Sequence, residues 1–297
     1  MFYNLKKRIN TNIFNYFVRD IVNTPKVICD DNSGFVLLSQ LCSRDLYMYL
    51  AALKSFTAYL KPYQVVIVGD RLTDKDEEIL VGQIPNLKII KASEVNTTDF
   101  PQGGTWERLL TIIDASQHHF VIQLDADTLT LADLFEIKEC VIQNRSFTLG
   151  TALGQKVITF QEASDLMVAN KLSEHIQVQA ELALGQVDLT GELRYVRGCS
   201  GFAGFAKGSC NRQQLKEITG AIEKIIGKSK WYEWGSEQVA SNILIANSNS
   251  PTVLPIAKYN YFKPGIDISK YSFLHFIGEY RFCAGTYWKL ASSLLIK

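Results

Sequence analysis

The sequence predicts an α/β protein with a mostly parallel, Rossmann-like sheet flanked by helices. Two observations predict this class. Short apolar runs alternate with amphipathic stretches between residues 34 and 90, an order typical of parallel strands joined by crossover helices. Further along, the apolar run 120–124 ends directly in two carboxylates, Asp125 and Asp127. Because ligands of open α/β sheets bind at the carboxyl ends of strands, we expect a binding site there.

The expected elements follow one another from residue 34 onward. Strands are expected where β-branched and large apolar residues cluster, and helices where apolar residues recur every three or four positions. The predicted strands are residues 34–41, 65–68, 87–90, 120–124, 147–150 and 157–160, with mostly helix over 161–184. Asp45, Thr73 and Thr105 each precede a predicted helix and are expected to cap it.

The composition describes a globular chain without a strong charge bias. The 297 residues carry a net charge of +1 and are 47% hydrophobic, which is ordinary for a globular protein. No long run of one charge occurs, so we expect no nucleic-acid partner. The six cysteines are scattered and form no C-x-x-C pair, which predicts reduced thiols and a cytoplasmic location. We find no signal peptide and no apolar run of about 18 residues or more.

The first 33 residues form an amphipathic extension that precedes the predicted domain of residues 34–297. Residues 1–28 mix basic side chains with apolar and aromatic ones. Such a segment packs on its own domain or lies on a membrane surface. We favour packing, and a peripheral membrane contact through residues 1–28 is the alternative.

Known phosphate-binding loops are absent from the sequence. No G-x-G-x-x-G follows the first strand and no G-x-x-x-x-G-K-[ST] occurs, which disfavours a dinucleotide fold and a P-loop enzyme. Asp125 and Asp127 offer hard oxygen ligands that suit Mg²⁺ or Mn²⁺, and such an ion neutralises a diphosphate. A plain turn is the alternative.

Arg108 lies in the first turn of the helix expected after Thr105. A cation at that end is unfavourable for the helix dipole. A nearby anionic ligand would explain the arginine, and an ordinary surface position is the simpler alternative.

Two later stretches carry polar residues beside small or aromatic ones. Residues 194–208 contain four glycines, which favours either close approach of a ligand or a bulged strand. Glu237 and Gln238 follow an aromatic cluster that includes Trp234. Their position suits a sugar-binding pocket. The alternative is that Ser236 is the N-cap of the next helix and that the helix dipole favours Glu237 in its first turn.

His275 follows the apolar residues Phe273 and Leu274, and Gly278 and Arg281 come shortly after it. A histidine in this position is commonly a buried core residue. Neutral imidazole is also a good third ligand for Mn²⁺, so a metal-binding role stays open at this point.

Four motifs in this order resemble those of GT-A-fold glycosyltransferases. They are Leu-Asp-Ala-Asp at 124–127, Ser-Gly-Phe-Ala-Gly at 200–204, Ser-Glu-Gln-Val-Ala-Ser-Asn at 236–242 and His-Phe-Ile-Gly-Glu-Tyr-Arg at 275–281. The chain is most similar to the retaining family 8 enzymes of the glycogenin and lipopolysaccharide galactosyltransferase type. The resemblance runs from about residue 34 to about residue 285 and implies a GT-A fold in a single catalytic domain.

The resemblance also implies roles for individual residues. A Mn²⁺ or Mg²⁺ ion would be held by Asp125, Asp127 and His275. The donor diphosphate would be bound by Arg108, Asp125, Gly278 and Arg281, the sugar and acceptor by Ser200, Gly201 and Trp234, and the reacting centre would lie at Glu237 and Gln238. The chain departs from the family in having Arg281 for lysine, Cys199-Ser200-Gly201 for Asn-Ala-Gly and Glu237 for aspartate, and in lacking the Lys-Pro-Trp ending.

The implied activity is metal-dependent transfer of a sugar from a nucleotide-diphosphate sugar to an acceptor hydroxyl of a glycan, lipid or protein, with retention. Three alternatives stay open. An inverting GT-A enzyme would use Glu237 as its base. A sugar nucleotidyltransferase would carry a glycine-rich loop after the first strand, but residues 41–45 contain no glycine. A non-catalytic relative ranks last because Asp125, Asp127 and His275 are all present.

Overall fold

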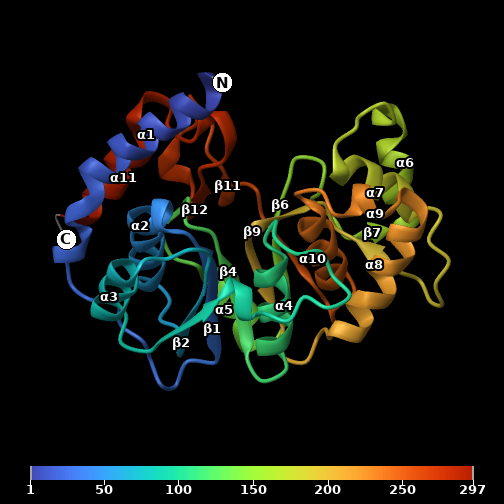
Figure 1. Cartoon of the computed structure of the whole chain (residues 1–297), viewed down its shortest axis with the longest axis horizontal. Coiled ribbons are helices and arrows are strands. Elements are labelled where there is room, and N and C mark those ends of the chain that lie inside the picture. The colour runs from blue at the N-terminus through green and yellow to red at the C-terminus, as the bar shows by residue number, and fades with distance from the viewer. Residues whose placement is uncertain (1, 296–297) are drawn as a thin grey trace. The chain divides into compact units, whose positions relative to one another are not determined.

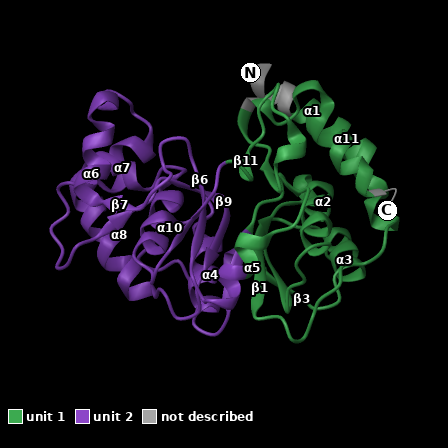
Figure 2. Ribbon diagram, turned by 180° about the vertical axis from the view of Figure 1, so that it is seen from behind, with its two compact units in different colours: residues 1–91, 124–138, 257–297 green, residues 92–123, 139–256 purple. Residues whose placement is uncertain are grey.

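The computed structural model describes residues 2–295, apart from the side chains of residues 2–7, 279 and 295. The chain forms two compact units (Figures 1 and 2). Unit 1 consists of Met1–Lys91, Leu124–Lys138 and Ala257–Lys297, and unit 2 consists of Ala92–Gln123 and Glu139–Ile256. The fold is mixed α/β with a mostly parallel sheet flanked by helices, as the sequence predicts.

Unit 1 begins its sheet with three parallel strands, β1 (Phe35–Leu41), β2 (Gln64–Gly69) and β3 (Leu87–Lys91). The crossover helices are α2 (Leu46–Thr57) and α3 (Asp74–Gln83). Apolar side chains fill β1 and β2, and α2 is buried along nearly its whole length, so these elements form the core of unit 1. These elements confirm the alternation predicted for residues 34–90.

The expected caps of these two helices differ in outcome. Thr73 and Asp76 form a complete capping box at the start of α3, so this cap is confirmed. Asp45 makes no capping hydrogen bond, and that prediction is wrong. Its carboxylate instead accepts hydrogen bonds from Arg44 and from the Cys42 thiol.

A second, smaller sheet in unit 1 has the order β11 (Tyr259–Tyr261), β12 (Phe273–His275) and β5 (Thr128–Thr130). β11 and β12 are parallel, and β12 and β5 are antiparallel. Ser39 on β1 donates a 2.6 Å hydrogen bond to the carbonyl of Leu124, which precedes the carboxylates. The start of the Asp-Ala-Asp turn is thereby fixed to the core of the unit.

The N-terminal helix α1 (Phe2–Val18) lies beside α11 (Thr286–Ser292) in unit 1 (Figure 1). The Phe14 ring is buried with its centroid 4.4 Å from that of Tyr287, and Phe17 stacks on Trp288 at 4.3 Å. One side of α1 therefore packs on the unit, while Ile9, Ile13 and Tyr16 are exposed. Within residues 2–295, no helix has the length and apolar character needed to cross a membrane.

Unit 2 contains strands in the order β10 (Thr252–Leu254), β6 (Phe147–Gly150), β9 (Gly198–Phe205) and β4 (Phe120–Leu124), the last of which ends at the unit boundary. β10 and β6 are parallel, whereas β6 and β9 are antiparallel with a bulge between Thr148 and Leu149. A Cβ on Gly204 would lie 2.2 Å from the Phe147 ring. The glycine-rich stretch is therefore a bulged strand that packs closely on its neighbour.

The helices of unit 2 include both parts of the stretch predicted as mostly helical. They are α4 (Trp106–Ser116), α6 (Phe160–Met167), α7 (Ile176–Leu184), α8 (Arg212–Ile226), α9 (Lys228–Trp231) and α10 (Ser236–Ala246). The predicted strand 157–160 is shorter than expected, because Thr159 and Glu162 form a capping box that starts α6. Only β7 (Ile158–Thr159) remains, paired with β8 (Arg194–Tyr195).

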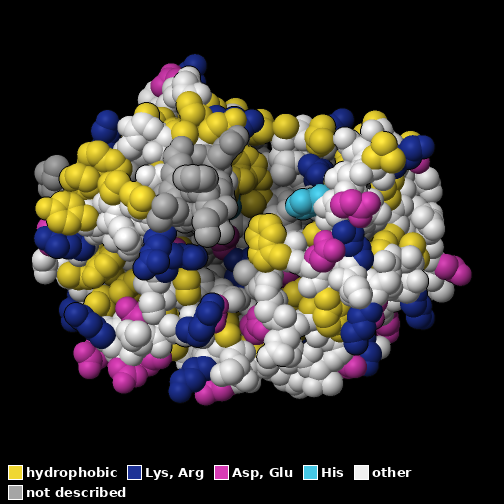
Figure 3. All heavy atoms as spheres, turned by 45° about the horizontal axis from the view of Figure 1, so that its top comes forward, with side chains coloured by type: hydrophobic (Ala, Val, Ile, Leu, Met, Phe, Trp, Pro, Cys, Tyr) yellow, Lys and Arg dark blue, Asp and Glu magenta, His cyan; other side chains and the backbone are white. Residues whose placement is uncertain are grey.

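The remaining elements are α5 and eight short 3₁₀ turns. α5 spans Phe135–Ile142 and crosses the unit boundary. The turns are η1 (Arg19–Asn23), η2 (Ser43–Asp45), η3 (Ala92–Glu94), η4 (Val168–Asn170), η5 (Ile268–Lys270), η6 (Gly278–Tyr280), η7 (Cys283–Gly285) and η8 (Ser293–Leu295). Cationic and acidic side chains are interspersed over the face shown in Figure 3, in keeping with the small net charge.

Candidate active site

Three candidate metal ligands come together in unit 1. One ligand atom each from Asp125, Asp127 and His275 lies within 4.8 Å of the other two. Asp127 and His275 are buried, whereas Asp125 is partly exposed. The group is thus open to solvent on the Asp125 side and enclosed by protein on the other.

Strand pairing explains why residues so far apart in sequence meet. β5 starts directly after Asp127 and runs antiparallel to β12, with Thr128 opposite His275. The backbone N–H of Phe276 donates to the Asp127 carbonyl at 2.8 Å. In the turn itself, the Thr128 hydroxyl donates to the Asp125 carbonyl at 2.8 Å. These bonds hold both aspartates at the end of the strand that carries His275.

The Asp127 carboxylate is contacted by two basic side chains. Its Oδ1 lies 3.1 Å from His275 Nε2, and its Oδ2 accepts a hydrogen bond from Arg281 Nη2. Burial alone would raise the pKa of Asp127, but its interactions with His275 and the Arg281 guanidinium outweigh burial and hold this pKa well below its usual range. Asp127 is therefore ionised at neutral pH.

Arg281 is oriented by a turn. Gly278 has a φ of +61°, a left-handed conformation that glycine adopts without strain. The chain then returns so that Arg281 Nε donates to the Phe276 carbonyl at 2.8 Å. The guanidinium is thus held by backbone on one edge and by Asp127 on the other.

The chemistry of this donor set fits a divalent cation. Two carboxylates and an imidazole supply hard oxygen ligands and one borderline nitrogen, which Mg²⁺ and Mn²⁺ accept. The ionised state of Asp127 suits this role, since a ligand must be deprotonated. The pair formed by Asp127 and Arg281 means that a metal would share this carboxylate with, or take it from, the arginine.

A second polar cluster lies in unit 2 around Glu237, near the start of α10. Arg108 and Glu237 are both buried, with Arg108 Nη2 3.3 Å from Glu237 Oε1. The Thr105 hydroxyl donates to Glu237 Oε2 at 3.0 Å, and Arg108 Nη2 donates to Ser200 Oγ at 3.4 Å. The simpler interpretation of Arg108 as a surface side chain is wrong, because it is paired with a buried carboxylate.

The two helix caps expected in this cluster, Thr105 and Ser236, are wrong because both hydroxyls bond to side chains elsewhere in unit 2. Thr105 has a φ of +76° and makes no capping hydrogen bond; its hydroxyl is used by Glu237 instead. Ser236 is the first residue of α10 rather than its cap, which is Gly235. The Ser236 hydroxyl accepts from Trp106 Nε1 at 3.0 Å. Tertiary partners thus take the hydroxyls that would otherwise cap the helices.

Gln238 belongs to a hydrogen-bonded chain that sequence reasoning missed. The backbone N–H of Ser200 donates to Gln238 Oε1, and Gln238 Nε2 donates to Gln177 Oε1, both at 3.3 Å. Gln177 Nε2 donates to Glu181 Oε1 at 3.0 Å. The available signal was a glutamine and a glutamate four positions apart, and therefore on one face, in the largely apolar helix α7.

Glu181 ends this chain at a buried ion pair. It accepts hydrogen bonds from the Tyr195 hydroxyl at 2.8 Å and from Arg197 Nε at 2.9 Å. Burial and the nearby Glu181 charge raise the pKa of Tyr195 well above its usual value. Tyr195 therefore remains a hydrogen-bond donor at all physiological pH values.

The chain is similar to known proteins in its structure, and not detectably in its sequence. No protein-family model matches the sequence, and no curated protein matches it. Among solved structures, the galactosyltransferase LgtC matches with a TM-score of 0.53 and 11% identity over 88% of this chain and 95% of its own. The fold is the GT-A fold.

Two further GT-A structures match over 88% of this chain. One is the bifunctional glycosyltransferase WbbM, with a TM-score of 0.51 and 14% identity. The other is the glycosyltransferase GlyE of Streptococcus pneumoniae TIGR4, with a TM-score of 0.53 and 11% identity. The chain spans 50% of WbbM and 60% of GlyE. Identities this low establish the shared GT-A fold alone.

The GT-A domain thus divides the predicted site residues into two groups. Unit 1 brings together Asp125, Asp127, His275, Gly278 and Arg281, and unit 2 brings together Arg108, Ser200, Glu237 and Gln238. Gly201 is buried within β9, and Trp234 is 75% exposed, outside the buried cluster. The roles of Gly201 and Trp234 in a sugar pocket stay predictions.

Proposed function

We propose that this chain is a metal-dependent glycosyltransferase that moves a sugar from a nucleotide-diphosphate sugar to an acceptor hydroxyl, with retention, and that it is related to family 8. The observation that carries the proposal is the group Asp125, Asp127 and His275 with Arg281 beside it. This group lies in a chain with a GT-A fold. Structures of LgtC with donor and acceptor sugar analogues support the same classes of ligand here.

The metal site would serve the leaving group. Mn²⁺, or Mg²⁺, held by Asp125, Asp127 and His275 would supply positive charge to the donor diphosphate. Arg281 can add to the positive charge that faces the diphosphate, because its guanidinium holds several N–H donors in a fixed position. Gly278 forms the turn that directs the Arg281 side chain to Asp127, so the role of the glycine would be to position the arginine. A direct role for Arg108 in donor binding stays a prediction, since its contacts are with Glu237 and Ser200.

The contacts of Glu237 bear on the stereochemical alternatives. A general base of an inverting enzyme must accept a proton from the acceptor hydroxyl. Glu237 is buried, and its carboxylate already accepts hydrogen bonds from Arg108 and Thr105, so an acceptor hydroxyl would have little access to it. Gln238 is neutral and can donate or accept next to a reacting sugar. This arrangement favours retention, with Gln238 near the anomeric carbon and Glu237 as its support.

We further propose a cytoplasmic location, because all six cysteines are free of disulfide bonds. A peripheral membrane contact through residues 1–28 rests on the exposed Ile9, Ile13 and Tyr16 of α1. The acceptor class under the proposal is a glycan, a lipid or a protein-linked hydroxyl.

A screen of nucleotide sugars tests the proposed function. Thermal stability and donor hydrolysis would be measured for a panel of nucleotide sugars, with and without Mn²⁺. We expect one donor to stabilise the protein only when Mn²⁺ is present. The partly exposed Asp125→Ala and the isosteric Asp127→Asn should both remove this response, whereas Asp133→Ala, an exposed aspartate of the same unit, should keep it. A wild-type protein that responds to none of the donors would contradict the proposal.

A further inference from the structure

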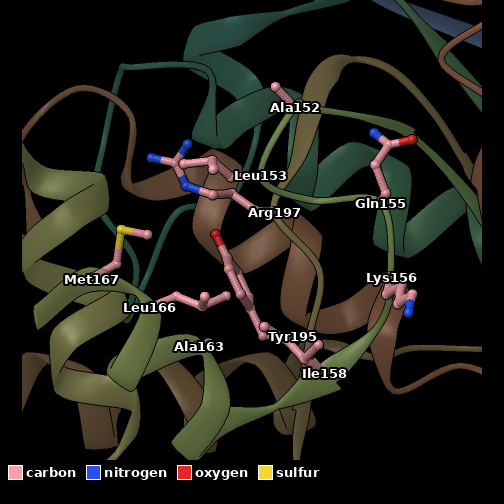
Figure 4. Close-up of a pocket in the computed structure, with 10 residues that line it drawn as sticks. All are labelled: Ala152, Leu153, Gln155, Lys156, Ile158, Ala163, Leu166, Met167, Tyr195 and Arg197. Atoms are coloured by element: carbon pink, nitrogen blue, oxygen red, sulfur yellow. The ribbon is translucent and has the colours of Figure 1, made fainter. Parts of the chain in front are cut away.

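A cavity of about 250 Å³ lies in unit 2, outside the clusters described above (Figure 4). Six of its lining residues are apolar and come from the segment after β6 and from α6: Ala152, Leu153, Ile158, Ala163, Leu166 and Met167. The other lining residues are Tyr195, Arg197, Gln155 and Lys156. In Figure 4 the Tyr195 ring stands between the α6 side and the Ile158 side, with its hydroxyl end toward Arg197.

The walls of this cavity are held in place without a ligand. The Thr151 hydroxyl donates to the Arg197 carbonyl at 2.7 Å. Gly154 packs so closely on the same residue that a Cβ would lie 2.1 Å from that carbonyl oxygen. Helix α6, which supplies three lining residues, is anchored where the Ser164 hydroxyl donates to the Leu182 carbonyl at 2.8 Å. A preformed pocket binds without an ordering cost, as ligand sites commonly do.

Arg197 is fixed along one edge of its guanidinium only. Its Nε donates to both oxygens of the buried Glu181, at 2.9 and 3.1 Å. Its two terminal nitrogens form no hydrogen bond to any residue within the described part of the chain. Because a guanidinium presents paired N–H groups along its edges, the remaining edge suits the two oxygens of a carboxylate or phosphate.

The charges of the lining favour an anion. Arg197 and Lys156 are the two ionisable groups of the lining apart from Tyr195, and no carboxylate is among them. Glu181 neutralises part of the Arg197 charge from behind, so Lys156 supplies the remaining positive charge. An anionic head group is therefore favoured beside apolar walls, and a cationic one is disfavoured.

The size of the cavity and its neighbours suggest what part of a ligand it would hold. Its volume is below the roughly 300 Å³ at which pockets for whole small molecules begin, so it would take a portion of a larger molecule. Hydrogen bonds lead from Arg197 through Glu181 and Gln177 to Gln238. The cavity is thus connected to the residue that we place near the reacting sugar.

We propose that this cavity is an acceptor subsite for an anionic amphiphile, that is, an alkyl or aryl group carrying a phosphate or carboxylate. The apolar part would contact Leu153, Leu166 and Met167, and the anionic group would bind the free edge of Arg197. The acceptor role of this cavity rests on the proposed glycosyltransferase function. The binding of an anionic amphiphile does not.

Calorimetric binding of simple probes to the full chain tests the site directly. n-Hexyl phosphate is the main probe, hexanoate ranks the two head groups, and n-hexanol and inorganic phosphate separate the two halves of the ligand. We expect n-hexyl phosphate to bind about tenfold or more tightly than n-hexanol or inorganic phosphate. Equal binding of all the probes, or no binding of either anionic amphiphile, would overturn the proposal.

Variants of exposed residues keep the test independent of folding. Leu166 is 53% exposed and lines the cavity, whereas Leu172 is 90% exposed and does not. Leu166→Asp should weaken n-hexyl phosphate binding about tenfold or more by repulsion, while Leu172→Asp should leave it unchanged. Arg197→Lys keeps a charge for Glu181 but lacks the second edge, so it should weaken binding with little change in Tm. Equal affinities of the Leu166 and Leu172 variants would overturn the assignment.

Donor binding in the same samples separates this proposal from the proposed function. Leu166→Asp should keep the Mn²⁺-dependent donor response of the wild type. A donor response without n-hexyl phosphate binding would overturn the subsite and leave the glycosyltransferase function standing. Binding of n-hexyl phosphate without any donor response would overturn the proposed function and, with it, the acceptor role of the cavity.

Discussion

Arg281 donates a hydrogen bond to the Asp127 carboxylate, the same carboxylate that faces His275 on its other oxygen. A fixed protein cation therefore already balances the buried carboxylate of the candidate metal ligands. A divalent ion at this site has to compete with Arg281 for Asp127, and a donor diphosphate would offer the arginine another anion. Metal and donor should then favour each other's binding through this one side chain.

Removing Arg281 is expected to separate metal affinity from donor affinity. Arg281→Gln should bind Mn²⁺ alone about fivefold more tightly, because a competing ion pair worth about 1 kcal/mol is lost. The same variant should bind the Mn²⁺-loaded donor more weakly, since the diphosphate loses a charged partner. Titration calorimetry checks both arms. Weaker binding of Mn²⁺ alone in Arg281→Gln would contradict the competition, and Arg281→Lys, which keeps the charge, is the control.

Glu237 and Gln238 are expected to fail in different ways when substituted. Glu237→Gln leaves the buried Arg108 without a full counter-charge, and breaking such a pair costs about 3 kcal/mol or more of unfolding free energy. Gln238→Ala should lower turnover about 100-fold with a smaller loss of stability. Urea unfolding and transfer assays, with product configuration determined by NMR, distinguish the two. A stable Glu237→Gln with abolished turnover would instead support a catalytic base and inversion.

The glycine-rich strand provides a test of packing with an internal control. Gly204→Ala would place a Cβ 2.2 Å from the buried Phe147 ring, and overpacking of this kind costs about 1–3 kcal/mol. Gly220→Ala lies in α8 with no atom within 4 Å of the new Cβ. It should stabilise the protein by about 0.5–1 kcal/mol, because alanine favours helix. Chemical denaturation of both variants checks the opposite signs, and equal effects would argue against the close approach of β9 and β6.

Glu136 is expected to make part of the stability of unit 1 depend on pH. It accepts hydrogen bonds from Lys258 at 2.5 Å and from the Tyr259 hydroxyl at 2.8 Å. Burial raises the pKa of Glu136, but these contacts and its backbone hydrogen bond outweigh burial and lower it below the ordinary 4.5. Since the folded state binds this proton less tightly than the unfolded chain, the stabilisation is complete above the ordinary pKa and disappears as the pH falls through the lower folded value.

Thermal unfolding of Glu136→Gln measures that contribution. At neutral pH the variant should be less stable by about 1 kcal/mol, because the charge is lost while a hydrogen-bond acceptor remains. The difference between wild type and variant should shrink from about pH 6 to about pH 3. A difference that is constant across this range would show that the charge of Glu136 contributes nothing.

Local patterns in the sequence were enough to predict β1, β2 and β3 of unit 1 and to select Asp125, Asp127 and His275 as candidate metal ligands. Asp125 and Asp127 stand out because carboxylates rarely follow a buried strand without a reason. His275 could be predicted because it also ends an apolar run, and the register between β5 and β12 then brings it beside Asp127. Each of these signals lies within a few residues of the group concerned.

The unit 2 cluster could not be predicted in this way, because its partners are distant in sequence. Arg108 and Glu237 are 129 residues apart, and nothing around either residue indicates the other. The Thr105 and Ser236 caps were predicted wrongly since tertiary contacts took both hydroxyls. By contrast, the capping box of Thr159 and Glu162 was readable, and it would have ended the predicted strand 157–160 earlier.

Unit 1 is made of three separate segments of the chain, so its candidate metal ligands are synthesised at different times. Asp127 leaves the ribosome 148 residues before His275, and every residue of unit 2 that follows the aspartates is synthesised in between. A nascent chain therefore completes unit 2 while its cation site still lacks the third ligand. Termination after Ile256 but before His275 would release a chain that has both aspartates and all of unit 2 but lacks the third candidate ligand.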